Sequence, residues 1–234
     1  MVYTTYMKTF SSLLFPPFCV CCERSLSQQS SWLCPLCLSR LSFNTHPLCI
    51  HCHAFPCTCG HPHLLWAPLV YEEPTRSLIH AYKYRGYEKL GLYLSSLFLS
   101  SLCSSFFIPS PATLIPIPPF YTKRLTRTYD HTHLFASHLS GHLALPLFSS
   151  LSRTRYTVPQ SSLSTSQEKR DNLVSAFSIQ GSLPSSVILV DDVVTSGATI
   201  QALEKEAYLH GASHVYTYAI ALASDLKESE RQGI

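Results

Sequence analysis

The chain has 234 residues, of which 46% are hydrophobic and 13% are charged. This length and composition suit one medium α/β domain with a small appendage, and they argue against wholesale disorder. The net charge of +3 is too small to indicate nucleic-acid binding by itself, although it suits a protein that handles a phosphate-rich anion. No window reaches the roughly 20 apolar residues of a membrane-spanning helix. The apolar run 10–20 lacks a small-residue cleavage site after it, so we expect a cytoplasmic protein.

The cysteines divide the chain near residue 60. Nine of the ten cysteines lie between Cys19 and Cys59, and Gly60-His61-Pro62 follows them. A segment so poor in large apolar residues cannot build its own core, whereas a structural Zn²⁺ contributes on the order of 10–16 kcal/mol of apparent binding free energy. We therefore predict a double zinc ribbon over residues 1–62 and a larger domain over residues 63–234.

The spacing of these cysteines is typical of zinc knuckles, because two cysteines separated by two residues can turn both thiolates onto one tetrahedral ion. Three of the four successive pairs have this spacing, and the last pair is one residue shorter. The simplest assignment places one zinc on Cys19, Cys22, Cys34 and Cys37, and a second on Cys49, Cys52, Cys57 and Cys59.

Several alternatives to this assignment stay open. The first and third knuckles could share one zinc, and Cys21 could replace Cys22 as a ligand. A histidine near the short last knuckle could replace a thiolate, the candidates being His51, His53, His61 and His63. A disulfide framework would need an oxidising compartment, and iron–sulfur ligation is a further alternative.

Beyond residue 62, strand and helix patterns alternate, which predicts an α/β fold with a mostly parallel sheet and helices on its faces. The expected elements are strands at 64–71, 113–116, 187–190 and 215–222, helices at 74–84, 87–107, 128–145 and 199–210, and a long loop at 151–172. Cys103 is expected in the core of its helix. We interpret the histidines of the third helix, His131, His133, His138 and His142, as solvated rather than metal-binding.

The segment 187–199 carries the strongest chemical signal. Val187 to Val190 form a continuous apolar run, as buried parallel strands do, and Asp191 and Asp192 follow at the end where ligands bind in open α/β sheets. Small residues then lead into a helix and expose backbone N–H groups that can cradle a phosphate; they are Thr195, Ser196, Gly197, Ala198 and Thr199. Gly197 lets the main chain approach the phosphate oxygens closely. The spacing fits a ribose 5-phosphate whose 2′- and 3′-hydroxyls bind the two carboxylates, although an ordinary βα turn with an Asp-Asp cap is the alternative.

This segment resembles the phosphoribosyl-pyrophosphate motif of type I phosphoribosyltransferases, and nearly the whole chain resembles the ComF family. ComF proteins are competence-associated, zinc-ribbon-containing proteins related to amidophosphoribosyltransferase. The matching segments are Leu13–Pro17 before Cys19, Lys83-Tyr84-Arg85-Gly86, Pro116-Ile117-Pro118, and Gln160, Leu163, Lys169, Arg170, Asn172 and Ala176-Phe177. Where the family usually has Arg-Gly-Phe-Asn, this chain has Arg127-Thr128-Tyr129-Asp130.

The resemblance implies a type I phosphoribosyltransferase fold that binds phosphoribosyl pyrophosphate with Mg²⁺. Catalysis would then need positioning and electrostatic stabilisation rather than a nucleophile, with Asp191, Asp192 and Arg127 as the catalytic candidates. Cations that could pair with the pyrophosphate are Lys123, Arg124 and Arg127, with Lys169 and Arg170 closing from the long loop, and Lys83 and Arg85 as weaker candidates. For each cation the alternative is a solvated surface charge.

Two classes of function follow. The first is a phosphoribosyltransferase with an unknown acceptor. The second, which the family resemblance implies, is a binding module whose zinc ribbons engage single-stranded DNA or a helicase-like, DNA-processing partner. Aromatic residues that could stack on bases are Trp32, Phe43 and Trp66.

Overall fold

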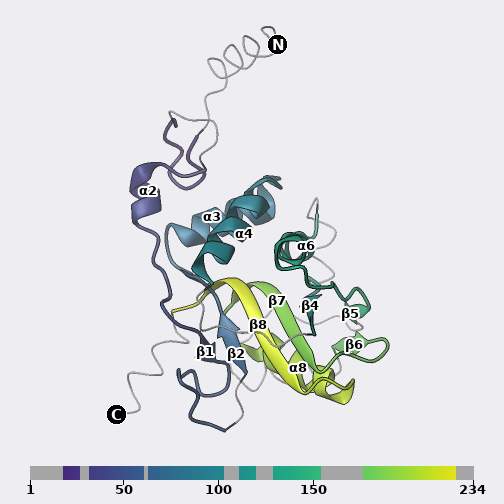
Figure 1. The fold of residues 1–234 in the computed structure, drawn as a ribbon. Helices are drawn as coiled ribbons and strands as arrows, with labels where there is room; N and C mark the ends of the chain where they lie inside the picture. The colour runs from purple at the N-terminus through teal and green to yellow at the C-terminus, as the bar shows by residue number, and fades with distance from the viewer. Residues whose placement is uncertain are drawn as a thin grey trace.

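The protein is described here by a computed structural model that covers residues 18–26, 32–60, 63–102, 111–119, 129–153 and 176–224. Its main sheet has six strands, ordered β1-β2-β8-β7-β4, with β3 also pairing with β8 (Figure 1). The main-sheet strands are β1 (Leu48–Cys49), β2 (Leu64–Trp66), β3 (Leu69–Val70), β4 (Ala112–Pro116), β7 (Ser186–Val194) and β8 (His214–Leu222). A separate two-stranded sheet joins β5 (Leu151–Arg153) to β6 (Phe177–Ile179).

The main sheet is mostly parallel, as the alternating pattern predicts. β7 pairs in parallel with β4 on one side and with β8 on the other, and β2 and β3 also run parallel to β8. Among the described strands of this sheet only β1 is antiparallel, at the edge beside β2. This edge strand belongs to the cysteine-rich segment, so that segment is built into the same sheet as the larger α/β part.

Helices cover both faces of the sheet (Figure 1). On one face, Ile188 and Val190 pack in a core cluster with residues of α3 (Thr75–Tyr84), α4 (Leu90–Ser101) and α6 (His131–Leu143). On the opposite face, Val187 and Leu189 pack with residues of α8 (Ala198–Leu209). Successive side chains of a strand point to opposite faces, and both faces of β7 are buried, which explains its continuous apolar run. The fifth described helix, α2 (Pro35–Ser39), lies in the cysteine-rich segment.

Most expected elements are present, with shifted ends. The helices expected at 74–84, 87–107, 128–145 and 199–210 correspond to α3, α4, α6 and α8, and residues 103–107 lie outside the described ranges. The strand expected at 64–71 is two short strands, because Ala67-Pro68 separates β2 from β3. Pro68 has no N–H with which to continue a ladder.

Two expectations near the candidate site are wrong. The loop expected from residue 151 begins instead as strand β5, which pairs with β6, and residues 154–172 fall outside the described part. The strand expected to stop at Val190 continues as β7 to Val194, so Asp191 and Asp192 lie inside it. Pairing with β8 sustains this extension, whereas the register with β4 ends opposite Val190.

The histidines of α6 do not share one environment. His133 and His142 are exposed, as expected, but His131 is only 1% exposed. Its ring contacts those of Tyr82 and Tyr129, at centroid distances of 5.2 and 4.4 Å. The interpretation of His131 as solvated is therefore wrong, since it fills part of the core between α3 and α6. Cys103 lies outside the described residues.

In the part of the chain that the structure describes, no helix has the length and apolar character needed to cross a membrane.

Candidate functional site: two cysteine clusters and a loop at the start of α8

The eight predicted cysteine ligands gather into two clusters, and within each cluster all sulfur atoms lie within 4.8 Å of one another. The clusters are Cys19, Cys22, Cys34 and Cys37, and Cys49, Cys52, Cys57 and Cys59. Consecutive knuckles are thus paired, and the crossed arrangement of the first and third knuckles is wrong. The four thiols of the second cluster converge without a histidine.

The spacing of the sulfur atoms fits zinc and does not fit disulfides. Sγ–Sγ distances are 3.6 Å for Cys22–Cys34 and 3.8 Å for Cys49–Cys59. A tetrahedral zinc with bonds of about 2.3 Å separates its sulfur ligands by about 3.8 Å, whereas a disulfide bond is about 2.05 Å long. All nine described cysteines are free thiols. These donor sets can each hold a Zn²⁺ ion.

Backbone N–H donors favour the thiolate form, which is the form that binds metals, at Cys19, Cys34 and Cys52, whereas burial and neighbouring thiols raise the pKa of Cys37. Burial raises the pKa of Cys19, but backbone N–H donors at Cys34, Cys22 and Cys21 outweigh it and lower the pKa to about 6. The pKa of Cys52 falls to about 5, chiefly because the backbone N–H of Thr58 donates to its sulfur. Such N–H donors are a feature of the tight turns that knuckles make.

Cys21 does not take the place of Cys22. Its thiol donates a hydrogen bond to the Pro74 carbonyl at 3.4 Å, beside the start of α3. Burial, followed by the charge of Cys19, raises the pKa of Cys21 to about 12. Cys21 therefore ties the first cluster to the larger α/β part as a neutral thiol.

The loop between β7 and α8 borders an open hollow. Its lining residues are Asp191 and the segment 193–200, which contains all five predicted phosphate-binding residues. Gly197 is the N-cap of α8 and has a left-handed conformation, with φ of 71°. Because this cap residue has no side chain, it leaves the first N–H groups of the helix to be satisfied by another partner, and an anion is well suited to that position.

The two predicted carboxylates leave β7 on opposite faces. Asp191 lines the hollow on the side of α8, whereas Asp192 is paired with Lys83 of α3, with 2.7 Å between Oδ1 and Nζ. Both side chains of this ion pair are largely buried, at 15% exposure for Lys83 and 12% for Asp192. Burial, followed by the charge of Asp192, raises the pKa of Asp191 to about 7. The loop and Asp191 thus share one hollow, and Asp192 lies behind the strand.

Arg153 is a residue near this site that sequence reasoning missed. It lies opposite Phe177 in the β5–β6 pair, and its guanidinium stacks over the Phe177 ring at 4.8 Å from the centroid. Burial lowers the pKa of Arg153 to about 10, while the charge of Asp191 acts in the opposite direction. A partly buried cation therefore acts electrostatically on the Asp191 carboxylate in the hollow. Its sequence context, a polar stretch assigned to a loop, carried no signal of burial.

The other predicted cations divide into two groups. Lys83 pairs with Asp192, and Arg85 lies 3.3 Å from Glu23 in an exposed ion pair. Neither cation is among the residues that line the hollow. The remaining five, Lys123, Arg124, Arg127, Lys169 and Arg170, lie outside the described residues.

The cysteine-rich segment packs directly on the loop. A Cβ added at Gly197 would lie 2.7 Å from Cδ1 of Ile50, which is fully buried. One turn further along α8, a second contact joins the same segments: the Gln201 side-chain amide donates a hydrogen bond to the Ile50 carbonyl at 3.3 Å. Glycine at position 197 is therefore needed for the close packing of Ile50, and it also leaves space for a phosphate.

Gly197→Ala is expected to lower the melting temperature even without ligand, because φ is positive and the new Cβ meets Ile50. Ile50→Ala alone should cost about 2–5 kcal/mol, the usual range for truncation of a buried aliphatic side chain. In the double variant the added Cβ no longer meets a side chain, so the combined loss should be smaller than the sum of the single losses. Urea denaturation of the four proteins measures this difference. Additive losses would contradict the contact.

Together these features define a class: a mixed α/β protein with a mostly parallel sheet, two cysteine clusters suited to zinc, and a candidate anion-binding loop after the central strand.

No family model matches the chain. It is 26% identical over 226 residues to Competence protein F of Haemophilus influenzae, covering 88% of this chain and 96% of that protein. It is 28% identical over 229 residues to DNA utilization protein YhgH of Escherichia coli, and equally to that of Shigella flexneri, covering 89% of this chain and 98% of each relative. These relatives support the resemblance to the ComF family that the motifs of the chain predict.

Proposed function

We propose that the chain binds phosphoribosyl pyrophosphate together with Mg²⁺ and that the loop 195–199 holds the 5-phosphate. The observation that carries the proposal is the hollow at the start of α8, where backbone N–H groups of a helix N-terminus lie beside the carboxylate of Asp191. A phosphate fits the first feature and a ribose hydroxyl fits the second. The proposal includes a type I phosphoribosyltransferase domain over residues 63–234 behind a double zinc ribbon over 1–62.

The carboxylates have different roles in this proposal. Asp191 accepts hydrogen bonds from ribose hydroxyls directly, since it lines the hollow. Asp192 reaches the ligand only if its side chain turns away from Lys83, and otherwise it holds the strand in place. The backbone N–H of Asp192 and the charges of Lys83 and Arg153 oppose the effect of burial on the pKa of Asp191, which nevertheless rises to about 7.

Transfer of the ribosyl group to an acceptor is the catalytic part of the proposal. Loss of pyrophosphate places positive charge on the sugar and negative charge on the leaving group, so stabilisation of charge is the protein's task. Arg127, Lys123 and Arg124 are proposed to pair with the pyrophosphate, with Lys169 and Arg170 closing over it. Mg²⁺ would neutralise part of that charge while keeping several of its waters. The acceptor is not specified by any of these residues.

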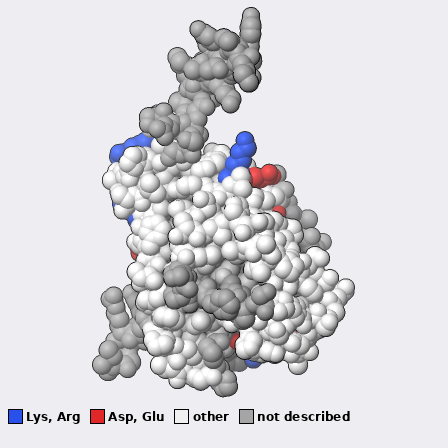
Figure 2. Space-filling model, in the orientation of Figure 1, with Lys and Arg blue, Asp and Glu red and all other residues white. Residues whose placement is uncertain are grey.

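A role in DNA utilisation is the second candidate, and the names of the relatives favour it. The described residues support direct base stacking only in part. Phe43 is 48% exposed, whereas Trp66 is 2% exposed and Trp32 packs beside Tyr87, so the expectation that Trp66 stacks on bases is wrong. On the face drawn in Figure 2 the described residues carry few charged side chains. We favour contact with a DNA-processing protein over extensive contact with DNA phosphates, because the net charge of the chain is only +3.

The test is a thermal melt with phosphoribosyl pyrophosphate and Mg²⁺. At a ligand concentration of 100 times Kd, stabilisation is about 2.7 kcal/mol, which corresponds to a rise on the order of 5–10 °C for a chain of this size. Thr199→Val keeps the shape of the side chain but removes its hydroxyl, and it should reduce the shift. Equal shifts with unrelated nucleotides, or none with phosphoribosyl pyrophosphate, would reject the proposal. Binding of single-stranded DNA that weakens steeply with salt would favour the second candidate.

A further inference from the structure

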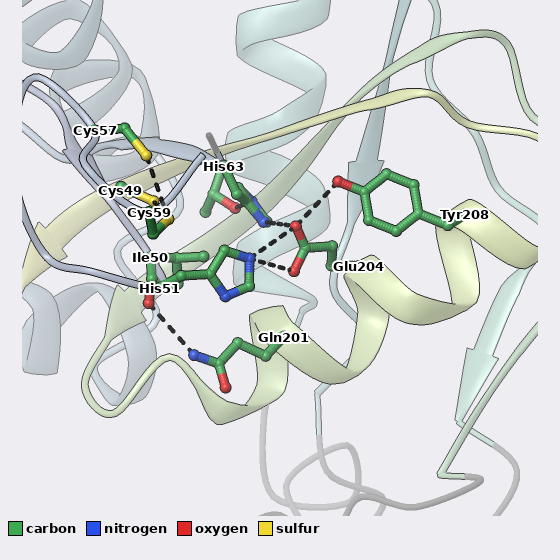
Figure 3. A network of polar contacts seen from close by, with 10 residues as sticks. Cys49, Ile50, His51, Cys57, Cys59, His63, Gln201, Glu204 and Tyr208 are labelled. Atoms are coloured by element: carbon green, nitrogen blue, oxygen red, sulfur yellow. Dashed lines mark hydrogen bonds and ion pairs between the residues drawn. The ribbon is translucent and has the colours of Figure 1, made fainter. Parts of the chain in front are cut away.

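Outside the two cysteine clusters, two histidines and a glutamate converge beneath the cysteine-rich segment (Figure 3). His51 comes from the turn between Cys49 and Cys52, His63 precedes β2, and Glu204 projects from α8. Nε2 of His51 lies 2.9 Å from one carboxylate oxygen of Glu204, and Nδ1 of His63 lies 2.9 Å from the other. One atom from each residue lies within 4.8 Å of the other two.

Neighbouring groups hold these side chains in an orientation that suits a metal. Nε2 of His63 lies 2.8 Å from the Thr217 hydroxyl, which leaves Nδ1 directed at the centre of the cluster. The Tyr208 hydroxyl donates to Glu204 at 3.2 Å, one turn further along α8. Metal-binding histidines typically use their second nitrogen in this way, and metal-binding carboxylates are themselves hydrogen-bonded. Both supports lie on elements of the larger α/β part.

The burial of the cluster is uneven. His63 and Thr217 are 0% exposed and Glu204 is 4% exposed, whereas the side chain of His51 is 33% exposed. A buried carboxylate is costly unless it is paired with a positive charge. The exposed edge at His51 is the side from which an ion would enter the cluster.

We propose that His51, His63 and Glu204 form a third metal site, separate from the cysteine clusters, for a divalent transition-metal ion such as Zn²⁺. Two imidazoles and a carboxylate with one open position form a common donor set for zinc. Tetrahedral zinc with bonds of about 2.0–2.2 Å separates its ligand atoms by about 3.3–3.5 Å. Both histidines therefore need to move outward by only a few tenths of an ångström. Among abundant divalent ions these ligands favour Zn²⁺ over Mg²⁺ or Ca²⁺, which prefer all-oxygen sites.

The proposed ion would fasten the cysteine-rich segment to α8. His51 belongs to a knuckle of the second cysteine cluster, and Glu204 lies two turns beyond Gly197 on the helix that begins at the candidate phosphate loop. The adjacent contact of Gln201 with Ile50 runs between the same two elements (Figure 3). The site joins segments more than 150 residues apart in the chain, which makes it a structural cross-link.

The test counts zinc in the full-length protein. After equilibration with Zn²⁺ and removal of free metal, the wild type should retain about three ions per chain, and His51→Asn and Glu204→Gln about two each. His53→Asn is the matched control, because it makes the same change in the same knuckle outside the cluster, at a residue whose positive φ of 58° asparagine tolerates. It should retain about three ions. Replacement of zinc by Co²⁺ should leave the thiolate-to-cobalt absorption equal in all four proteins.

Two results would overturn the site. One is a wild type that saturates at about two ions with both cysteine clusters filled. The other is a folded Glu204→Gln variant that retains the third ion. Should Glu204→Gln fail to fold, His51→Asn decides the question, since its side chain is partly exposed and its loss leaves the buried His63–Thr217 contact in place.

Discussion

Removal of zinc from the two cysteine clusters is expected to unfold residues 19–59 and to leave most of the larger α/β part folded. The apparent binding free energy of a structural zinc, on the order of 10–16 kcal/mol, is comparable to the whole stability of a typical domain, about 5–15 kcal/mol. The larger part keeps its own core on both faces of the sheet. Stepwise release of zinc by a thiol-reactive mercurial, followed by hydrogen exchange, measures both effects and counts about two thiolate-bound ions.

The two clusters should differ in what their loss disturbs. Cys22→Ser should free one zinc and loosen the contact of Cys21 with Pro74, with little effect on α8. Cys52→Ser should also free one zinc, but it should additionally release β1 and the contact between Ile50 and Gln201. Hydrogen exchange at the start of α8 should therefore rise only in Cys52→Ser. Purified protein with no zinc and no free thiols would contradict the zinc assignment and favour disulfides.

Replacement of both Asp191 and Asp192 by asparagine should weaken the binding of phosphoribosyl pyrophosphate at least tenfold. Hydrogen bonds to charged groups are worth about 1.5–3 kcal/mol, and loss of even one costs about a factor of ten or more. Because only Asp191 lines the hollow, Asp191→Asn alone should account for most of the loss. Calorimetric titration measures the affinities. Glu206→Gln, a change of charge on α8 outside the hollow, is the control and should bind as the wild type does.

Unliganded stability should separate the two aspartates. The pKa of Asp191 is raised to about 7 in the folded state, so its ionisation costs stability as pH rises from its ordinary pKa through 7. Asp191→Asn should therefore raise the melting temperature at pH 8 and change it little at pH 4. Asp192→Asn should lower it, because Lys83 is left largely buried without its carboxylate partner. If Asp191→Asn lowers the stability at pH 8 and leaves ligand affinity intact, the carboxylate stabilises the βα turn and does not bind the ligand.

The features that the sequence predicts well are those set by local spacing. Four cysteine knuckles specify two cysteine clusters, since each pair of thiols is positioned by its own tight turn. The apolar run before Asp191 and the small residues after it specify a buried strand, a turn and a helix. The sequence by itself therefore determines the mixed α/β fold, the cysteine ligands and the location of the candidate loop.

Only the tertiary structure decides what these local features meet. The strand that carries Asp191 and Asp192 is extended by its partner β8, and the pleat then sends the two carboxylates to opposite faces. Arg153 is partly buried because β5 pairs with a strand 24 residues away, as the register Arg153↔Phe177 shows. Ile50 meets Gly197, and His51 meets Glu204, because the cysteine-rich segment adds a strand to the edge of the sheet. Such long-range contacts depend on strand pairing and on the packing of both faces, and the spacing of residues along the chain does not encode them.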